Sequence, residues 1–252
     1  MCGMDNLRNL FYVIGLSLCA SCSSKVTKEE VVDEVKKEST IDIDVIGNSQ
    51  FICFTPMDCE MKYVVENPPA TTDSTILLCI PASFTATDLK TICGTYVIDS
   101  VIYNSDFKVE EDVDASFACW GDSVCFAKGK DMASLDSVVK HDGVFFMQKH
   151  VLCNGEKGNI EFKNGPKLDP KYYRVLAKYN DKLCIIQSAT PVVYQNFVEG
   201  LVKLGVKDAI YLDMGGWSYS WYRNNEGLPI ELFPKGPSTK YQTNWLVFRR
   251  MQ

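Results

Sequence analysis

The alternation of apolar and polar residues predicts a chain built mostly of β-strands. Short runs rich in β-branched and aromatic residues are separated by Gly, Pro, Asn and Asp, which favour turns. The run Thr75–Pro81 is continuously apolar, which is typical of a strand that is buried on both faces. The other expected strands are Ile41–Ile46, Gln50–Phe54, Lys62–Glu66, Thr95–Tyr103, Ala115–Trp120, Val124–Ala127, Gly143–Cys153, Tyr172–Tyr179, Leu183–Gln187, Ile210–Leu212, Pro229–Phe233 and Trp245–Arg249.

Two segments are candidate helices. The clearer one is Thr190–Leu204, which a Thr-Pro pair opens and Gly205 is placed to end. Phe197 and Leu201 lie on its apolar face, so we expect both side chains to be buried against a sheet. The second candidate, Met132–Val139, is shorter.

A strand, the clearer helix and the strand before Asp213 give a β-α-β run. The sequence shows no internal repeat, and nothing after residue 40 resembles a domain linker. Its hydrophobic content of 46% is enough to build a sizeable core. We therefore expect one α+β domain over residues 41–252, with a mixed, mainly antiparallel sheet packed with a few helices.

The N-terminus has the pattern of a bacterial lipoprotein signal over residues 1–22. Its apolar run is too short to span a membrane, and the small residues Ala20 and Ser21 stand directly before Cys22. We expect Cys22 to be lipidated and the protein to be membrane-anchored in the cell envelope, either periplasmic or surface-exposed. An ordinary cleaved secretory signal is the alternative. Residues 23–40 are highly charged and are expected to form a tether, with a short amphipathic helix as the alternative.

Composition narrows the classes of partner. The formal net charge of −6 argues against nucleic acid, whose phosphates need a basic surface. No Cys/His spacing resembles a zinc site, so the sequence requires no metal and no cofactor. Most cysteines after residue 22 stand in apolar strand runs and are expected in the core. Cys53 and Cys59 are the favoured pair if a disulfide forms.

The stretch Ala209–Gly227 carries the candidate chemistry. A short apolar strand ends at Asp213, and Gly215 and Gly216 follow, which let the backbone turn and approach a ligand closely. A carboxylate at a strand end, a glycine turn and aromatic rings together predict a sugar site. Aromatic side chains that simply fill the core are the alternative. The aromatic residues are Trp217, Tyr219, Trp221 and Tyr222.

Arg174 stands in an otherwise apolar and aromatic strand. It either points to solvent or, if it points inward, must meet an anion.

Four motifs in order between Tyr172 and Arg249 resemble the phosphodiester glycosidase family. They are YYRVLAKYNDKLCIIQS, KLGVKDA, YLDMGGWSYSWYRNNEG and TNWLVF. The resemblance looks closest to a lipoprotein branch found in gut bacteria. The matching residues are Arg174 for the family's strand arginine, Asp213, Gly215, Gly216 and Ser218 for its Leu-Asp-Gly-Gly-Gly-Ser motif, and Asn244 for the asparagine before its last strand.

The chain departs from the family pattern at two places. The family's Asn-Gly-Gly-Phe-Phe turn is replaced by the segment from Pro81 to Thr85, which lacks the asparagine and both glycines. Met214 replaces the first glycine after Asp213.

The resemblance implies hydrolysis of a sugar that is linked through its anomeric carbon to a phosphodiester, as in the mannose-6-phosphate uncovering enzyme. It implies that Arg174 holds the phosphate, that Asp213 activates water or stabilises the oxocarbenium-like centre, and that Asn244 fixes sugar hydroxyls. Ser218 shares the role of Asn244, and the amides of Gly215 and Gly216 would hold an anionic oxygen beside Trp217 and Trp221.

No second catalytic carboxyl is obvious, although Glu226 and Glu231 lie downstream. Two alternatives stay open. One is a catalytically lapsed homologue that binds glycans in the cell envelope, and the other is a structural lipoprotein.

Overall fold

The computed structural model describes residues 38–162, 165–166, 168–214 and 218–251. The chain divides into two units, Met1–Lys36 and Lys37–Gln252, and every described residue belongs to the second. Cys22 and the expected signal segment lie outside the described residues. Within the described part, no helix has the length and apolar character needed to cross a membrane.

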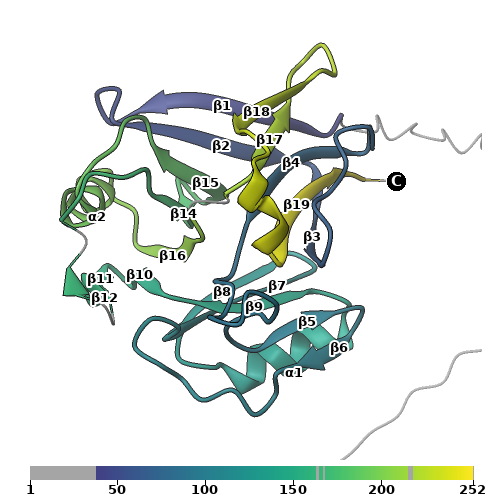
Figure 1. Cartoon of the computed structure of the whole chain (residues 1–252), viewed down its shortest axis with the longest axis vertical. Helices are drawn as coiled ribbons and strands as arrows, with labels where there is room; N and C mark the ends of the chain where they lie inside the picture. The colour runs from purple at the N-terminus through teal and green to yellow at the C-terminus, as the bar shows by residue number, and fades with distance from the viewer. Residues whose placement is uncertain (1–37, 163–164, 167, 215–217, 252) are drawn as a thin grey trace, which may run out of the picture. The chain divides into compact units, whose positions relative to one another are not determined.

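Three antiparallel sheets make up most of the described unit (Figure 1). The first contains, in spatial order, β1 (Thr40–Ile46), β2 (Phe51–Met57), β15 (Lys182–Ser188), β14 (Arg174–Tyr179), β16 (Asp208–Leu212), β10 (His150–Cys153) and β11 (Glu156–Lys157). The second contains β18 (Pro229–Phe233), β17 (Ser220–Arg223), β4 (Ile76–Pro81), β19 (Asn244–Arg250) and β3 (Cys59–Val65). The third contains β6 (Val101–Tyr103), β5 (Tyr96–Ile98), β9 (Val144–Gln148), β7 (Ala115–Trp120) and β8 (Ser123–Lys128).

The remaining elements are few. A short hairpin joins β12 (Glu161–Phe162) to β13 (Gly165–Pro166), and η1 (Pro237–Tyr241) is a 3-10 helix. The described residues contain two α-helices, α1 (Met132–Lys140) and α2 (Tyr194–Lys203). The fold is therefore mainly antiparallel sheet with few helices, as expected, but it is richer in β-structure than an α+β class implies.

The central core lies between the three sheets. Each contributes fully buried side chains, including Phe54 and Leu176 from the first sheet, Ile80 and Leu246 from the second, and Phe146 from the third. The continuous apolar run before residue 81 forms β4, in which every residue is buried. The sequence pattern thus identified the most buried strand of the second sheet.

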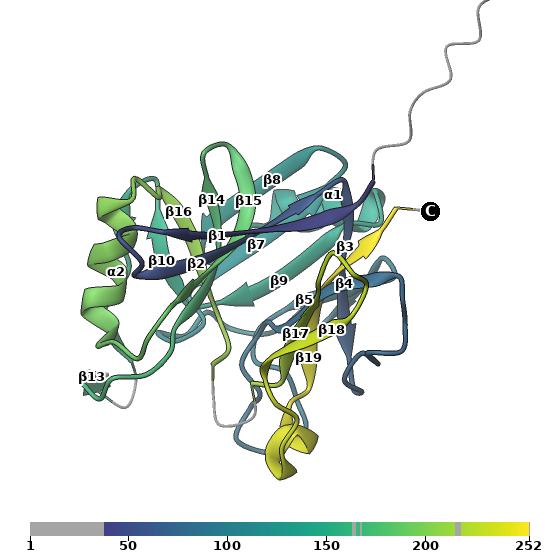
Figure 2. The same ribbon diagram turned by 90° about the horizontal axis from the view of Figure 1, so that it is seen from above.

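Helix α2 packs on the first sheet (Figure 2). Phe197 and Leu201 are 1% and 0% exposed, so the predicted burial of both is confirmed. The helix begins four residues later than expected, because the residue before it, Val193, is still extended. The backbone of Val192 pairs with Lys171 in both directions, at 2.9 and 3.0 Å.

The expected β-α-β run is present as β15, α2 and β16. Strand β14 lies between the two outer strands and is antiparallel to both, so β15 and β16 run parallel. Gly205, with φ of +82°, follows the helix and turns the chain into β16, as the sequence predicts.

Two segments expected as single strands are each divided. Thr95–Tyr103 forms the hairpin β5–β6, and its turn residues Asp99 and Ser100 have φ of +48° and +60°. Gly143–Cys153 is divided at Lys149, because β9 pairs in the third sheet and β10 in the first. The chain therefore passes from the third sheet to the first at Lys149. The alternation of apolar and polar residues does not reveal such a change of sheet.

The favoured disulfide between Cys53 and Cys59 is absent, since both thiols are free. Cys53 faces the core beneath α2. The Cys59 thiol instead donates to the carbonyl oxygens of Thr40 and Met57, at 3.4 and 3.2 Å. The two side chains therefore belong to different environments.

Candidate functional site

A cavity of about 430 Å³ opens at the end of β16. This volume lies in the range typical of small-molecule sites. Its wall combines aromatic rings with carboxylates and one lysine. The lining residues are Phe84, Thr85, Ala86, Thr87, Cys93, Glu110, Asp112, Val113, Phe162, Lys171, Tyr172, Tyr173, Tyr211, Asp213 and Met214.

Asp213 directly follows β16 and lines this cavity, with 7% of its surface exposed. Its backbone N–H donates to the carbonyl oxygen of Ala82 at 3.0 Å. The side chain of Gln148 donates to the same oxygen at 3.1 Å. The segment that replaces the family's Asn-Gly-Gly turn is therefore held beside Asp213, although it lacks the family's residues.

Tyr211 is the centre of the aromatic wall. Its ring centroid lies 5.5 Å from that of Phe84, 6.0 Å from Phe162 and 6.4 Å from Tyr173. Aromatic rings of this kind offer flat apolar faces on which a sugar ring can stack.

Two further carboxylates, Glu110 and Asp112, line the same cavity as Asp213. The pKa of the Cys93 thiol is raised, first by burial and then by the negative charges of Glu110 and Asp213. Glu110 and Asp213, which are far apart in the sequence, therefore both lie close enough to the Cys93 thiol to raise its pKa. Sequence reasoning missed Glu110 and Asp112, for which the acidic run before β7 was the available signal.

Lys149 is fully buried behind this wall. Its Nζ lies 3.5 Å from Asp112 Oδ1 and 3.3 Å from the carbonyl oxygen of Glu111. The same Nζ lies 4.7 Å from the ring centroid of Phe162. The Lys149 side chain therefore holds the segment of Glu111 and Asp112 against the back of the cavity wall.

Two phenols of the cavity wall, those of Tyr173 and Tyr211, stay protonated at neutral pH. Burial raises the pKa of Tyr173 to about 12. Burial, and after it the nearby Asp213 carboxylate, holds the pKa of Tyr211 well above its ordinary value. The Tyr173 hydroxyl is buried and has no hydrogen-bond partner among the described residues, so it has a donor and an acceptor to offer a ligand.

Arg174 points inward, which was one of the two expected orientations, but it does not line the cavity. Its Nε and Nη2 donate to Gln187 Oε1 at 2.9 and 2.6 Å, and Nη2 donates to Ser220 Oγ at 3.1 Å. Complete burial lowers the pKa of Arg174 to about 9, while Tyr211, Cys79 and Asp213 oppose that shift. Its Nη1 is buried, and no described residue gives it a hydrogen-bond partner.

Asn244 is also buried and outside the cavity lining. Its Nδ2 donates to the carbonyl oxygen of Ser83 at 3.0 Å, and its Oδ1 accepts from the Ser83 N–H at 2.7 Å. The Asn244 side chain therefore holds the backbone of Ser83, in the segment beside Asp213.

The other predicted site residues that the structure describes do not line this cavity. Trp221 is fully buried between strands of the second sheet, which is the core position that the sequence analysis kept open. Ser218 is 7% exposed, and its carbonyl oxygen accepts from Ser220 Oγ at 3.2 Å. Glu226 and Glu231 are exposed and do not line the cavity. Gly215, Gly216 and Trp217 lie outside the described residues.

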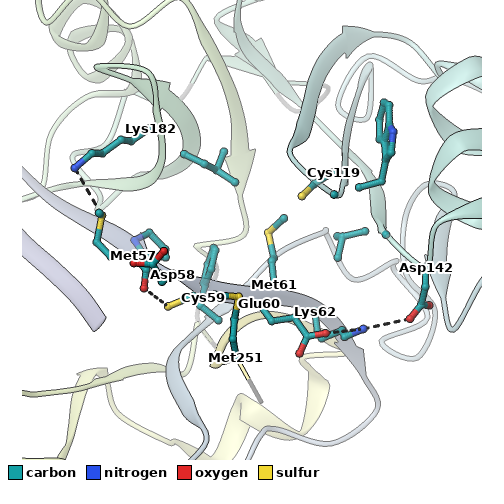
Figure 3. Close-up of a pocket in the computed structure, with 17 residues that line it drawn as sticks. Met57, Asp58, Cys59, Glu60, Met61, Lys62, Cys119, Asp142, Lys182 and Met251 are labelled. Carbon is teal, nitrogen blue, oxygen red and sulfur yellow. Dashed lines mark hydrogen bonds and ion pairs between the residues drawn. The ribbon is translucent and has the colours of Figure 1, made fainter. Parts of the chain in front are cut away.

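A second cavity, of about 520 Å³, is lined by sulfur-bearing and charged side chains (Figure 3). Lys62 lies at its edge, 3.1 Å from Glu60 and 3.4 Å from Asp142. None of the predicted site residues that the structure describes lines this cavity. The cavity beside Asp213 is therefore the candidate site.

The described residues contain no group of three or more His, Cys, Asp or Glu side chains arranged to hold a metal ion. The chemistry available at the cavity is that of carboxylates, a lysine, phenols and aromatic rings.

Comparison with known proteins gives a structural likeness only. No protein-family model matches the chain. No curated protein matches it either. The catalytic domain of zebrafish N-acetylglucosamine-1-phosphodiester alpha-N-acetylglucosaminidase, auto-inhibited by its pro-peptide, is similar with a TM-score of 0.57 and 11% identity over 85% of this chain and 82% of that one. A hypothetical protein from Synechocystis has a TM-score of 0.43 and 11% identity, over 83% of this chain and 61% of that one. The first likeness shows a remotely shared fold.

Proposed function

We propose that this protein is a hydrolase that cleaves a sugar-1-phosphodiester in the cavity beside Asp213. The observation that supports the proposal is that Asp213 shares this cavity with Glu110 and Asp112. A pair of carboxylates in one sugar-sized cavity supplies the groups that most glycoside hydrolases use. The zebrafish domain with the shared fold bears the name of such an enzyme.

In the proposed reaction, water attacks the anomeric carbon and the bond from that carbon to the phosphate oxygen breaks. The products are a free sugar and a phosphomonoester. Asp213 takes the proton of the water or stabilises the positive charge at the sugar, while Lys171 in the cavity wall attracts the phosphate. Because a phosphate leaves with a low pKa, proton donation by Glu110 or Asp112 is an aid rather than a requirement.

Arg174 and Asn244 are proposed to act on the site from behind it. Asn244 fixes the backbone of Ser83 beside Asp213. The Arg174 guanidinium adds positive charge close enough to Asp213 for the two charges to interact. Gly215, Gly216, Trp217 and Ser218 continue the chain from Asp213 and stay proposed contacts of the substrate.

The protein is further proposed to be an exported lipoprotein of the bacterial lipoprotein branch, anchored in the cell envelope through Cys22. Residues 1–22 would form the signal, 23–40 the tether and 41–252 the functional domain. The support is the sequence alone, because small residues stand directly before Cys22.

A catalytically lapsed homologue that binds glycans is the second candidate. The specific observation that favours it is Arg174, which is held inside the protein by Gln187 and Ser220. A substrate phosphate in the cavity would then lack the bidentate arginine contact that the family resemblance implies.

A turnover assay separates the two candidates. The full-length chain is incubated with a panel of sugar-1-(p-nitrophenyl phosphate) diesters, and a phosphatase then converts any released p-nitrophenyl phosphate into coloured p-nitrophenol. Colour that appears only after the phosphatase step identifies cleavage at the anomeric carbon. No turnover, together with saturation transfer from the protein to a sugar of the panel, would favour the lapsed homologue.

Asp213→Asn is expected to lower the rate about 10²-fold or more, the usual scale for a positioned acid–base group. The matched control is Asp136→Asn, because Asp136 is an exposed carboxylate on α1, away from the cavity. A rate that Asp213→Asn leaves unchanged would exclude Asp213 from catalysis.

A further inference from the structure

Another cavity, of about 470 Å³, has no part in the proposed reaction. We call it the Tyr96 cavity and define it by six of its lining residues, which are Glu66, Lys90, Tyr96, Tyr103, Lys240 and Gln242. The loop that begins at Phe84 contributes to both cavities. Its first residues, up to Thr87, line the cavity of Asp213, while Leu89 to Ile92 line the Tyr96 cavity.

The first feature of the Tyr96 cavity is a stack of tyrosine rings. Tyr96 and Tyr103 face each other across β5 and β6 with centroids 5.1 Å apart and an interplanar angle of only 4°. Tyr63 supports the stack from the core, with its centroid 5.6 Å from that of Tyr96. Tyr103 is 42% exposed, so the stack ends in a ring that a ligand can reach. A rigid, flat ring at a cavity wall is suited to the C–H face of a pyranose.

The second feature is a buried acceptor without a donor. Gln242 is 3% exposed, and its Nε2 donates to the carbonyl oxygen of Asn244 at 3.2 Å. This bond fixes the orientation of the amide, because a carbonyl oxygen needs a donor. Gln242 Oε1 is then left buried with no hydrogen-bond partner among the described residues. A buried acceptor in this state is costly, and a hydroxyl donor from a ligand would satisfy it.

The third feature is the charge around the cavity. Lys90 and Lys240 are exposed residues of its lining, and among the residues that the structure describes Glu66 is the one carboxylate that lines it. The Lys240 Nζ lies 4.9 Å from the ring centroid of Tyr241, which positions the ammonium group. Two cations against one carboxylate stand out in a chain with a formal net charge of −6. They favour a ligand with an acidic group.

We propose that the Tyr96 cavity is a second binding site, specific for a saccharide that carries a carboxylate. The pyranose ring stacks on the Tyr96–Tyr103 pair, a sugar hydroxyl donates to Gln242 Oε1, and the carboxylate lies near Lys90 and Lys240. The site binds and does not catalyse. It goes beyond the proposed hydrolysis and does not depend on it, since it shares no lining residue with the cavity of Asp213.

The probe is a hyaluronan tetrasaccharide, which alternates glucuronic acid with N-acetylglucosamine, and cellotetraose is the neutral comparison. Saturation-transfer NMR on the full-length chain detects ring contact, and calorimetry gives the Kd. The expected result is tighter binding of the acidic tetrasaccharide. Tyr103→Ala should weaken it about tenfold, the scale of losing one well-packed aromatic contact. Ile102→Ala should leave it unchanged, because that side chain points to the other face of β6.

Two further variants separate the parts of the proposal. Lys90→Gln combined with Lys240→Gln should reduce the affinity for hyaluronan to that for cellotetraose. Asp213→Asn should leave both affinities unchanged even if it abolishes turnover, which distinguishes this site from the proposed active site. Absence of saturation transfer, binding insensitive to Tyr103→Ala, or equal affinity for both tetrasaccharides would overturn the proposal.

Discussion

Asn244 holds the backbone of Ser83 by both ends of its side-chain amide, donating to the carbonyl oxygen at 3.0 Å and accepting from the N–H at 2.7 Å. The two residues are far apart in sequence and both are buried. Ser83 also accepts a bond from the Tyr63 hydroxyl at 3.0 Å and donates to the carbonyl oxygen of Met147 at 3.1 Å. The segment beside Asp213 is thus fixed to the second and third sheets, and among these contacts Asn244 makes both of the bonds to the Ser83 backbone.

Asn244→Leu should lower the free energy of unfolding by about 2–4 kcal/mol, because it leaves two buried backbone groups of Ser83 without partners at about 1–3 kcal/mol each. Urea unfolding followed by circular dichroism measures the change. Asn225→Leu is the control, since Asn225 is exposed in a turn and should change stability by less than about 0.5 kcal/mol. Equal effects of the two substitutions would contradict the structural role of Asn244.

The sequence predicts local structure well where one periodicity dominates. The apolar face of α2 and the continuously buried β4 follow directly from the spacing of apolar residues. The prediction of element boundaries fails where backbone pairing between distant segments determines the conformation. Val192, for example, pairs with Lys171 and is not part of the helix. The division at Lys149 has the same cause, because the chain changes sheets there.

The candidate site shows the same limit. Asp213 was identified because a strand end and a glycine turn are local features. Glu110 and Asp112 stand in a segment that follows no periodic pattern, and only the tertiary fold brings them to the cavity that Asp213 lines. Trp221 shows the opposite error, because the sequence proposed it as a substrate contact and the structure buries it in β17. A dense run of aromatic residues is equally compatible with a sugar-binding surface and with a buried strand.

The N-terminus of α1 gives a pH-dependent prediction. Asp131 caps this helix by accepting from the Ala133 N–H at 3.2 Å, and its carboxylate also accepts from the Ser134 hydroxyl at 2.5 Å. The Ser134 hydroxyl, more than any other group, lowers the pKa of Asp131 below its ordinary value. The unfolded chain therefore binds a proton at higher pH than the folded chain, so this stabilisation is present above about pH 4 and is lost as the pH falls further.

Asp131→Ala should cost about 1 kcal/mol at pH 7, the usual value of a helix cap, and the difference from wild type should shrink as the pH falls below about 4. Thermal unfolding between pH 3 and pH 7 measures it. Asp136→Ala, at an exposed position of the same helix, should show no such pH dependence. A destabilisation that stays constant down to pH 3 would exclude the charged cap as its cause.

The proposed anchor is tested separately from the fold. Cys22→Ser should leave the protein without lipid, because the thiol is the group that lipoprotein processing modifies. Mass spectrometry of the N-terminal peptide should show an acylated Cys22 in the wild type and no acylation in the variant. Cys2→Ser is the control, because it removes a cysteine from the same region and should leave the acylation intact. A wild-type N-terminal peptide free of lipid would refute the proposed anchor.

Removing the hydroxyl of Tyr173 tests substrate binding in the cavity beside Asp213 without disturbing the fold. It is buried and has no hydrogen-bond partner within the described structure, so the folded protein gains nothing from it. Tyr173→Phe should leave the free energy of unfolding unchanged or raise it by up to about 1 kcal/mol. If the cavity binds the sugar-1-phosphodiester, the same change removes a hydrogen bond to the substrate and should raise KM about three- to tenfold.

Tyr222→Phe is the matched control, because Tyr222 packs on Phe54 outside the cavity and should not alter KM. A loss of stability in Tyr173→Phe without any change in KM would show that the hydroxyl serves the fold and not the substrate.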